Sequence, residues 1–515
     1  MKSHLLLCMT VVAAIVLGSC SKNSAVLDVV PADVDVVLTA DIDDAVNTYG
    51  ISFADSGIVF PEEFPAGLIQ PSYSKVIANV ANTLDLTNVV MFARLNGETT
   101  GNPGFYAVAG VTEPDALVEI LKTKLGATTQ ADNGLTRFSI DGINVYIKDG
   151  LAWLTNGDAA AVNAVADAAK SDCFFSSAVA KAVAPEGSST LYINTGFISN
   201  VMPLIQSQLP IDQRMAVSAA VDYLTGKWLI MSTDHSGETF TSKMTACDAD
   251  GNILEVPYLK DLDASFLKYV PESYTAVLAG ALNDDALTML QTLYSTYASA
   301  AVPRAMASQL ESVVKAFEGN FFVATDLNAA LAGAKEPEMM PLTMGVKFKS
   351  DDEARNALNT IADIARMTFD AANVSVTPEM VTIKADNYNT FNIYAKDSYL
   401  LTTNESELGS GNSQLKQYVS GHELALGVEI ASLTTISPEY DFGLQLGICV
   451  DPKSVSSSVR YTGKSLAYIA GKMLGAAYGT QQPFEPEPDN WEDDYAEEVP
   501  DSLLITDHNS QVLAY

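Results

Sequence analysis

An internal repeat constrains the fold of this chain more than any other feature. The segment Val29–Val46 (VVPADVDVVLTADIDDAV) returns as Tyr269–Leu287 (YVPESYTAVLAGALNDDAL). Further along, Asn144–Asn156 (NVYIKDGLAWLTN) returns as Asn392–Asn404 (NIYAKDSYLLTTN). The matched letters fall on apolar strand-like runs and on turn residues, so the repeated unit is structural rather than catalytic in character.

Two weaker matches follow the same order along the chain. Asn88–Leu95 (NVVMFARL) is matched by Asn320–Leu327 (NFFVATDL), and a predicted turn at Asp234 is matched by one at Asp451. Four matches in one order predict two homologous halves. A unit of about 200 residues buries roughly 70% of its unfolded surface, which is enough for an independent core.

Each half shows the same mixture of strands and helices. A three-stranded meander over Thr136–Asn156, with turns at Asp141 and Asp149, indicates antiparallel sheet. Amphipathic helices are predicted at Glu113–Leu125 and Ala159–Lys170. Because an antiparallel sheet often keeps one solvated face, we expect helices on the other. The predicted fold class is α+β, with two homologous halves, each an antiparallel sheet covered by helices, and a disordered acidic C-terminal tail.

Two segments stand apart from the repeat. Gly50–Ser72 carries prolines and phenylalanines and has no evident counterpart after Leu287. As a long irregular loop, it is our candidate for a contact surface specific to the first half. Ser465–Tyr478 is predicted to form a small-residue helix that packs on the second half.

The C-terminal segment after this helix is strongly acidic. Residues 481–515 carry ten acidic residues and no Lys or Arg, and Glu and Pro alternate at their start. This composition favours an extended, self-repelling chain. The alternative is a partner-binding peptide built on three aromatic residues, Phe484, Trp491 and Tyr495.

The first twenty residues, MKSHLLLCMTVVAAIVLGSC, have the pattern of an export signal. Lys2 precedes an apolar run from Leu5 to Leu17, which is shorter than the roughly 20 residues that span a bilayer. The ending LGSC resembles the lipobox of bacterial lipoproteins, whose cysteine is acylated and becomes the first residue of the mature chain. Cys20 is therefore the predicted lipidation site, carrying palmitate-type acyl chains.

The expected organisation follows from these features. No later apolar run approaches membrane length, so we expect lipid alone to hold a soluble body at the membrane. The predicted units are a lipoprotein signal peptide at 1–19, a lipidated linker at 20–28, a first repeat half at 29–252, a second repeat half with a C-terminal helix at 262–479, and an acidic tail at 480–515.

The composition of the chain excludes some classes of partner and predicts the state of its cysteines. With 63 acidic and 29 basic residues, a net charge of −34, the chain lacks the cation clusters that nucleic acid requires, so no nucleic-acid partner is expected. Hydrophobic residues make up 48% of the chain, which argues against a disordered body. Cys173, Cys247 and Cys449 are predicted to be buried free thiols, and at most one pair of them can form a disulfide.

Motifs for nucleophilic or metal catalysis are missing from the sequence. Beyond the signal, the histidines are His235, predicted in a hairpin turn, His422 and His508, and neither HExxH nor GxSxG occurs. In the predicted mature chain Ser-x-x-Lys occurs four times without a KTG box, at Ser72/Lys75, Ser265/Lys268, Ser312/Lys315 and Ser413/Lys416. We therefore assign no catalytic, cofactor-binding or metal-binding residue, and no cofactor.

Carboxylates leave one enzymatic alternative open. The clusters Asp41/Asp43/Asp44 and Asp351/Asp352 would supply a glycosidase pair only if the fold brought two of them together. Their position at predicted helix starts favours N-capping instead. Asp248–Asn252 (DADGN) has its glycine fourth rather than sixth, so a turn is predicted there and not a calcium loop.

These features together resemble a known family. The lipobox, the opening strand VPADVDVVLTADI and the duplicated β-rich body look like a lipoprotein family of gut-type Gram-negative bacteria that is catalogued as domain of unknown function 4836. The resemblance implies a cell-envelope, outer-membrane lipoprotein and brings no established substrate. In similar lipoproteins an acidic run after the cysteine accompanies surface display. Here SKNS follows Cys20, so periplasm-facing and surface-exposed positions both stay open.

Two functions of different classes follow. We favour a membrane-anchored, non-enzymatic binding or scaffolding module whose partner is an envelope protein or a glycan. The alternative is a carboxylate-dependent secreted hydrolase acting on glycan or peptide. Acidic groups with raised pKa in a deep, aromatic-lined pocket would favour the hydrolase, and a shallow apolar patch at the junction of the halves would favour the binding module.

Overall fold

The structure is a computed structural model. It describes residues 24–65, 68–95, 104–125, 127–140, 143–197, 225–295, 304–332, 340–385, 390–434, 436, 438 and 440–478. Several predictions fall outside these residues: the signal peptide, Cys20, the turn at Asp141, His508 and the acidic tail.

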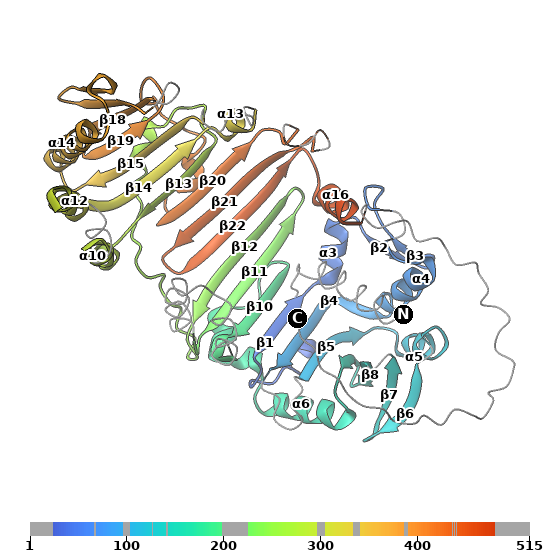
Figure 1. The fold of residues 1–515 in the computed structure, drawn as a ribbon. Coiled ribbons are helices and arrows are strands. Elements are labelled where there is room, and N and C mark those ends of the chain that lie inside the picture. Colours follow the sequence, from blue (N-terminus) through green and yellow to red (C-terminus); the bar gives the residue numbers. More distant parts are fainter. Residues whose placement is uncertain are drawn as a thin grey trace, which may run out of the picture.

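Twenty strands of the described chain form one large antiparallel sheet of a mixed helix-and-sheet fold (Figure 1). From its outer edge to the centre, the strands of the N-terminal half are β6 (Thr128–Asp132), β7 (Leu135–Ile140), β8 (Ile143–Lys148), β9 (Leu151–Thr155), β5 (Gly104–Val111), β4 (Leu84–Arg94), β1 (Val36–Ala40), β10 (Ser189–Asn194), β11 (Trp228–Ser236) and β12 (Thr239–Cys247).

The C-terminal half continues the same sheet in mirrored order. From the centre outward its strands are β22 (Ser454–Thr462), β21 (Gly443–Asp451), β20 (Leu424–Ile430), β13 (Ala276–Ala281), β14 (Phe317–Thr325), β15 (Leu342–Phe348), β19 (Tyr399–Thr403), β18 (Thr390–Lys396), β17 (Met380–Lys384) and β16 (Val374–Val376). The halves meet where β12 pairs with β22, from Thr239 opposite Arg460 to Met244 opposite Val455. We call this pairing the seam.

The matched sequence segments make the same hydrogen bonds in both halves. The Asn144 amide donates to the carbonyl of Gly157, and the Asn392 amide donates to the carbonyl of Glu405, each over 2.9 Å. One residue past each strand end, Asn156 accepts from the backbone of Phe105 at the start of β5, and Asn404 accepts from the backbone of Leu342 at the start of β15. These repeated residues fix strand ends, which agrees with the structural character predicted for the repeat.

Helices cover one face of the sheet, here called face A, which carries Val37 and Val277. In the N-terminal half they are α2 (Ser24–Leu27), α6 (Ala159–Ser171), the 3-10 helix η1 (Phe174–Ser176) and α7 (Ala178–Ala182), packed around a core with Trp153 and Tyr192. In the C-terminal half they are η3 (Ala264–Tyr269) and α15 (Lys416–Val419).

The opposite face, face B, carries Leu38 and Leu278. Over the N-terminal half it is covered by α3 (Ile42–Thr48), the hairpin β2 (Ser52–Ala54) and β3 (Gly57–Val59), α4 (Pro71–Ala81), α5 (Pro114–Thr123) and α16 (Leu466–Tyr478). Over the outer C-terminal half it is covered by α14 (Asp351–Thr368), against which α12 (Arg304–Ala316) packs. The remaining short helices are η2 (Thr195–Phe197), α10 (Asp284–Leu293), α13 (Leu327–Ala332) and η6 (Ala371–Asn373).

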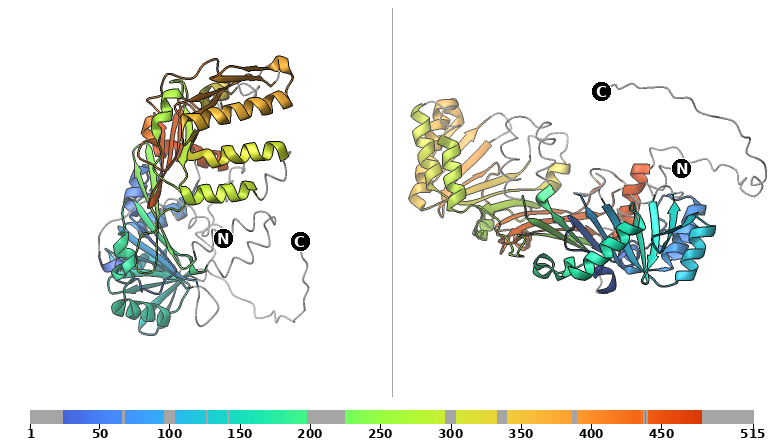
Figure 2. Two further views of the ribbon diagram at one scale, coloured as in Figure 1. Left: turned by 90° about the vertical axis from the view of Figure 1, so that its left-hand side faces the viewer. Right: turned by 90° about the horizontal axis from the view of Figure 1, so that it is seen from below.

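Helices therefore lie on both faces, and the predicted solvated face is wrong for most of the sheet. Figure 2 shows this layering: α6 lies on one side, while α10, α12, α14 and α16 lie on the other. Each half needs cover on both faces because its strands carry apolar residues on both. In β4, for example, Phe92 belongs to the core on face A and Met91 packs against the core on face B.

Two segments differ from their predicted placement. The C-terminal helix α16 lies mainly on the N-terminal half, where its Ala467, Ala470 and Leu474 pack against the same core as Leu38 and Met91. It meets the predicted C-terminal half through Tyr468, which donates a hydrogen bond to Asp441 and contacts the ring of Phe442. The segment Gly50–Ser72 is not an irregular contact loop: it forms the β2–β3 hairpin, and its phenylalanines and Ile58 pack into the same core.

His235 also lies elsewhere than predicted. It is a buried residue of β11 opposite Phe240, because the hairpin turn comes later, at Gly237 with φ of 57°. Its ring lies 5.1 Å from the ring of Phe240 and 5.6 Å from the ring of Tyr49. The matched position Asp234 is likewise a strand residue and not a turn.

Candidate functional site

The predicted carboxylate clusters serve as helix starts. Asp41 is the N-cap of α3 and accepts a hydrogen bond of 2.9 Å from the backbone of Asp44. Asp351 and Asp352 lie in the first turn of α14, where their charges favour the helix dipole. The predicted N-cap is confirmed for Asp41, whereas the N-cap of α14 is Ser350 and its two aspartates supply the predicted first-turn charge.

The other sequence candidates also have structural partners. Asp248 accepts hydrogen bonds from the backbone of Asp250 and Asn252, so DADGN is the predicted turn. Among the Ser-x-x-Lys lysines, Lys268 pairs with Asp397 and Lys315 pairs with Glu311. Cys173, Cys247 and Cys449 are free thiols as predicted, but only Cys247 is buried and the other two are half-buried. Burial and the charge of Asp248 raise the pKa of Cys247 to about 11. A thiol with so high a pKa is a weak nucleophile at neutral pH.

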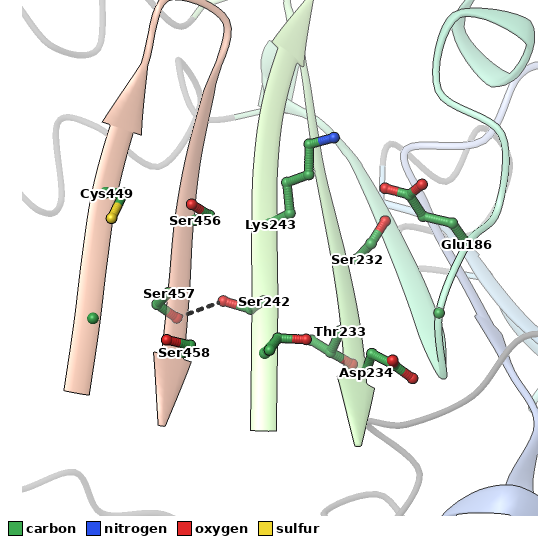
Figure 3. A pocket seen from close by; sticks show the side chains of 13 residues that line it. Glu186, Ser232, Thr233, Asp234, Ser242, Lys243, Cys449, Ser456, Ser457 and Ser458 are labelled. Atoms are coloured by element: carbon green, nitrogen blue, oxygen red, sulfur yellow. Dashed lines mark hydrogen bonds between the residues drawn. The ribbon is translucent and has the colours of Figure 1, made fainter. Parts of the chain in front are cut away.

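A polar pocket of about 400 Å³ lies on face A at the seam (Figure 3). Four neighbouring strands line it with the side chains of Ser232, Asp234, Thr241, Lys243, Ser456, Ser458 and Cys449, and Glu186 stands at its edge. Strand pairing places these residues together, since Ser232 faces Lys243, Lys243 faces Ser456, and Ser456 faces Cys449. In the sequence these residues lie in two pairs of strands about 200 residues apart, β11–β12 and β21–β22. Only the pairing of β12 with β22 brings them together as a pocket.

The lining of this seam pocket is polar and carries charges of both signs. Its lining holds hydroxyls, one ammonium and two carboxylates but no histidine. Asp234 accepts a hydrogen bond of 2.8 Å from Ser188, and burial raises the pKa of the Cys449 thiol.

A second pocket, of about 690 Å³, combines carboxylates with tyrosines. Asp397 accepts hydrogen bonds from Lys268 over 2.6 Å and from Tyr269 over 2.5 Å, and these bonds lower the pKa of its carboxyl. A general acid requires the opposite shift. The residues of this pocket therefore do not meet the condition set above for a hydrolase.

A third region, on face B of the C-terminal half, is apolar and open. Met344, Val323, Leu278, Leu426 and Ile448 face one another on neighbouring strands and form one row across β15, β14, β13, β20 and β21. Because side chains alternate between faces along a strand, the adjacent row on the same face consists of Phe321, Leu424, Val450, Val455 and Met244. We call these ten residues the open apolar face.

Solvent reaches this face directly. Leu278 and Met244 are each 40% exposed and Val323 is 39% exposed. Within the part of the chain that the structure describes, the one helix on this side between α16 and the group α10, α12 and α14 is the short α13, which lies at the ends of β13 and β20 (Figure 2). Contiguous exposed apolar side chains mark interaction surfaces more often than scattered single ones do. The sequence signal was the continuous apolar run AVLAGA in the opening strand of the second half, but this run does not tell whether a helix covers either face of the strand.

A buried carboxylate lies at the start of β20. Glu423 is only 7% exposed, and its Oε2 has no hydrogen-bond partner. Burial, together with the charges of Asp261, Asp451 and Glu255, raises its pKa. Beside it, Nδ1 of His422 lies 2.7 Å from Oδ1 of Asp451, at the junction of a loop with β20. The described residues contain no group of three or more His, Cys, Asp or Glu that could hold a metal ion.

Comparisons with known proteins add little to these observations. No family model matches the chain, and no curated protein matches it. Solved structures of TP0453 are similar at 13–14% identity: crystal forms I, IV and III give TM-scores of 0.26, 0.27 and 0.27 and cover 43–44% of this chain and 79–80% of TP0453. TM-scores this low carry no conclusion about function. Among the described helices, none is long and apolar enough to cross a membrane.

Proposed function

We propose that this chain is a membrane-anchored lipoprotein of the cell envelope that acts as a non-enzymatic binding or scaffolding module. One observation carries the binding part: the open apolar face near the junction of the halves, with Leu278, Val323 and Met244 exposed. Exposure of such an apolar surface to water is unfavourable in free energy unless a partner covers it. The seam pocket adds a polar binding surface on the opposite face.

The anchor part of the proposal rests on the N-terminal sequence. The LGSC ending at Cys20 would place acyl chains immediately before the described chain, which begins at Ser24. Three acyl chains hold a protein firmly at a membrane, since two such signals already suffice. We place it at the outer membrane, facing the periplasm or the surface, within the family of domain of unknown function 4836 that it resembles.

We further infer that the two halves arose by duplication of one ancestral unit. The mirrored strand order on the two sides of the seam supports this, as do the paired hydrogen bonds of Asn144 with Asn392 and of Asn156 with Asn404. Chance similarity between β-rich segments would not be expected to reproduce both the pairing partners and the side-chain contacts.

Metabolic labelling with a radioactive fatty acid tests the anchor. The wild-type chain should take up label and Cys20→Ser should not. Equal labelling of both, or labelling of neither, would refute the lipoprotein assignment. Crosslinking in intact cells with the anchor retained tests the module: reproducible crosslinked partners support it, and turnover of glycan or peptide by the purified chain would contradict it.

A further inference from the structure

We propose that the open apolar face binds an amphipathic helix of another protein, whose apolar stripe is flanked by Lys and Arg. This inference rests on the proposed binding function and names the kind of partner that function would involve. It is supported by the way the same sheet is covered elsewhere in the molecule, and by charge.

The open apolar face continues an interface that a helix already occupies. Strand pairing joins Met244 to Met231, then to Leu191, and then to Leu38, in one row of side chains on face B. At Leu38 this row lies beneath α16, which contributes Ala467, Ala470 and Leu474. The row therefore runs from a helix-covered part of the sheet into an uncovered part with the same chemistry.

A helix is also the cover that the geometry of a sheet favours. An apolar sheet face is buried in stable domains by a second layer, and in this molecule every core formed on either face of the large sheet includes helical residues. Met244 and Met344 lie within the open apolar face, and flexible thioether side chains adapt to helices of different sequence. The face therefore fits an apolar stripe without demanding one particular sequence.

Acidic residues around the open apolar face favour basic residues beside the apolar stripe of the partner helix. The ten residues of the open apolar face are uncharged, while acidic residues stand near both ends of β13: Asp284 and Asp285 open α10 at one end, and Asp326 follows β14 at the other. The whole chain has a net charge of −34. Complementary charge raises the rate and selectivity of association, so Lys and Arg flanks are favoured and a second copy of this acidic chain is not.

The test uses the full chain carrying Cys20→Ser, so that attached acyl chains do not compete for the face. The probe is a peptide of about 18 residues made of Leu and Lys, with Leu at helical i, i+3, i+4 spacing. A Leu and Glu peptide with the same stripe is its charge control. Binding is measured by calorimetry in about 0.3 M salt, where screening weakens contacts that rest on charge alone.

Two substitutions separate the face from general electrostatics. Leu278→Asp places a charge in the centre of the face, and Met367→Asp adds the same charge on α14, where Met367 is 62% exposed. We expect the Leu and Lys peptide to bind saturably, Leu278→Asp to weaken it at least tenfold, and Met367→Asp to change it less than twofold. The weakening is informative because an added carboxylate should strengthen a purely electrostatic contact with a cationic peptide.

Several results would overturn the inference. Equal effects of both substitutions, or absence of saturable binding, would refute the proposed docking surface. Equal affinity for the Leu and Glu peptide would refute the preference for Lys and Arg beside the stripe. Leu278-dependent binding to phosphatidylethanolamine–phosphatidylglycerol vesicles without peptide binding would identify a lipid surface, and Leu278-dependent self-association would identify a second copy. If the peptide binds as expected but Cys20 is not acylated in cells, the docking surface is supported and the lipoprotein assignment is refuted.

Discussion

The two halves of the sheet share their strand order but differ in what covers face B. In the N-terminal half Leu38 and Met91 lie under α3 and α16, whereas the matched residues Leu278 and Val323 are exposed. The added cover comes from two places outside the repeat, the Gly50–Ser72 segment and the C-terminal helix. The repeated part therefore supplies the scaffold, and the unrepeated segments decide which half keeps an accessible surface.

Removal of α16 should have the largest effect on the difference between the two halves. Leu466 and Ile469 are buried, and burial of a large aliphatic side chain contributes about 1.5–3 kcal/mol, so a chain ending at Lys464 should lose about 3–6 kcal/mol of stability. The loss should appear in hydrogen exchange as faster exchange of β1 and β4 with β13 and β14 unchanged. A chain ending at Tyr478 is the control. Equal acceleration in both halves would show that α16 does not act on one half alone.

A matched pair of substitutions gives the next largest contrast. Leu38→Asp puts a carboxylate beneath α16 and should lower the free energy of unfolding by about 2–3 kcal/mol, because a charge is buried without a partner. Leu278→Asp stays accessible to water and should cost less than about 0.5 kcal/mol. Urea unfolding of both variants measures the difference. Similar costs at the two positions would mean that Leu278 is covered in solution.

Glu423 provides a contrast in pH dependence. Strand pairing puts it at the position that Ser188 holds in the N-terminal half, where the Ser188 hydroxyl donates to Asp234. Glu423 instead faces Asp451 as a second carboxylate, and its pKa is raised. A carboxyl whose folded pKa lies above the unfolded value binds its proton more tightly in the folded state, so stability falls as pH rises through that window.

Glu423→Gln should remove this loss. The amide adds N–H donors and no charge, so at pH 7 the variant should be about 1 kcal/mol more stable than wild type, and the two should converge below about pH 4. Chemical unfolding across that pH range is the measurement. A variant that is less stable at pH 7, or an advantage that persists at low pH, would show that the Glu423 carboxylate is not the destabilising charge.

The sequence predicted what local chemistry decides. The helix starts at Asp41 and at Asp351, the hairpin with left-handed Asp149 and Gly150, and the strands of the repeat all depend on residues near one another in the chain. Such features follow from capping, turn preference and alternation.

The missed features depend on contacts between distant segments. The pairing of β12 with β22 joins residues more than 200 positions apart, and no local pattern encodes which strand meets which. The same holds for α16: its small residues predict a close approach, but the partner surface, where Gly471 lies against the backbone of Glu63, belongs to the other half. The seam pocket and the open apolar face were beyond prediction for this reason.

The smallest predicted effect concerns the seam. Ser242 and Ser457 share a hydrogen bond of 2.9 Å between their hydroxyls, across the strands that join the halves. Because a neutral hydrogen bond contributes about 1 kcal/mol net, Ser242→Ala and Ser457→Ala should each cost about that much, and the double variant should cost less than their sum. Ser456→Ala, on the neighbouring residue that faces the seam pocket, is the control and should be close to neutral. Strict additivity in urea unfolding would mean that the two hydroxyls act independently and that their hydrogen bond does not help to join the halves.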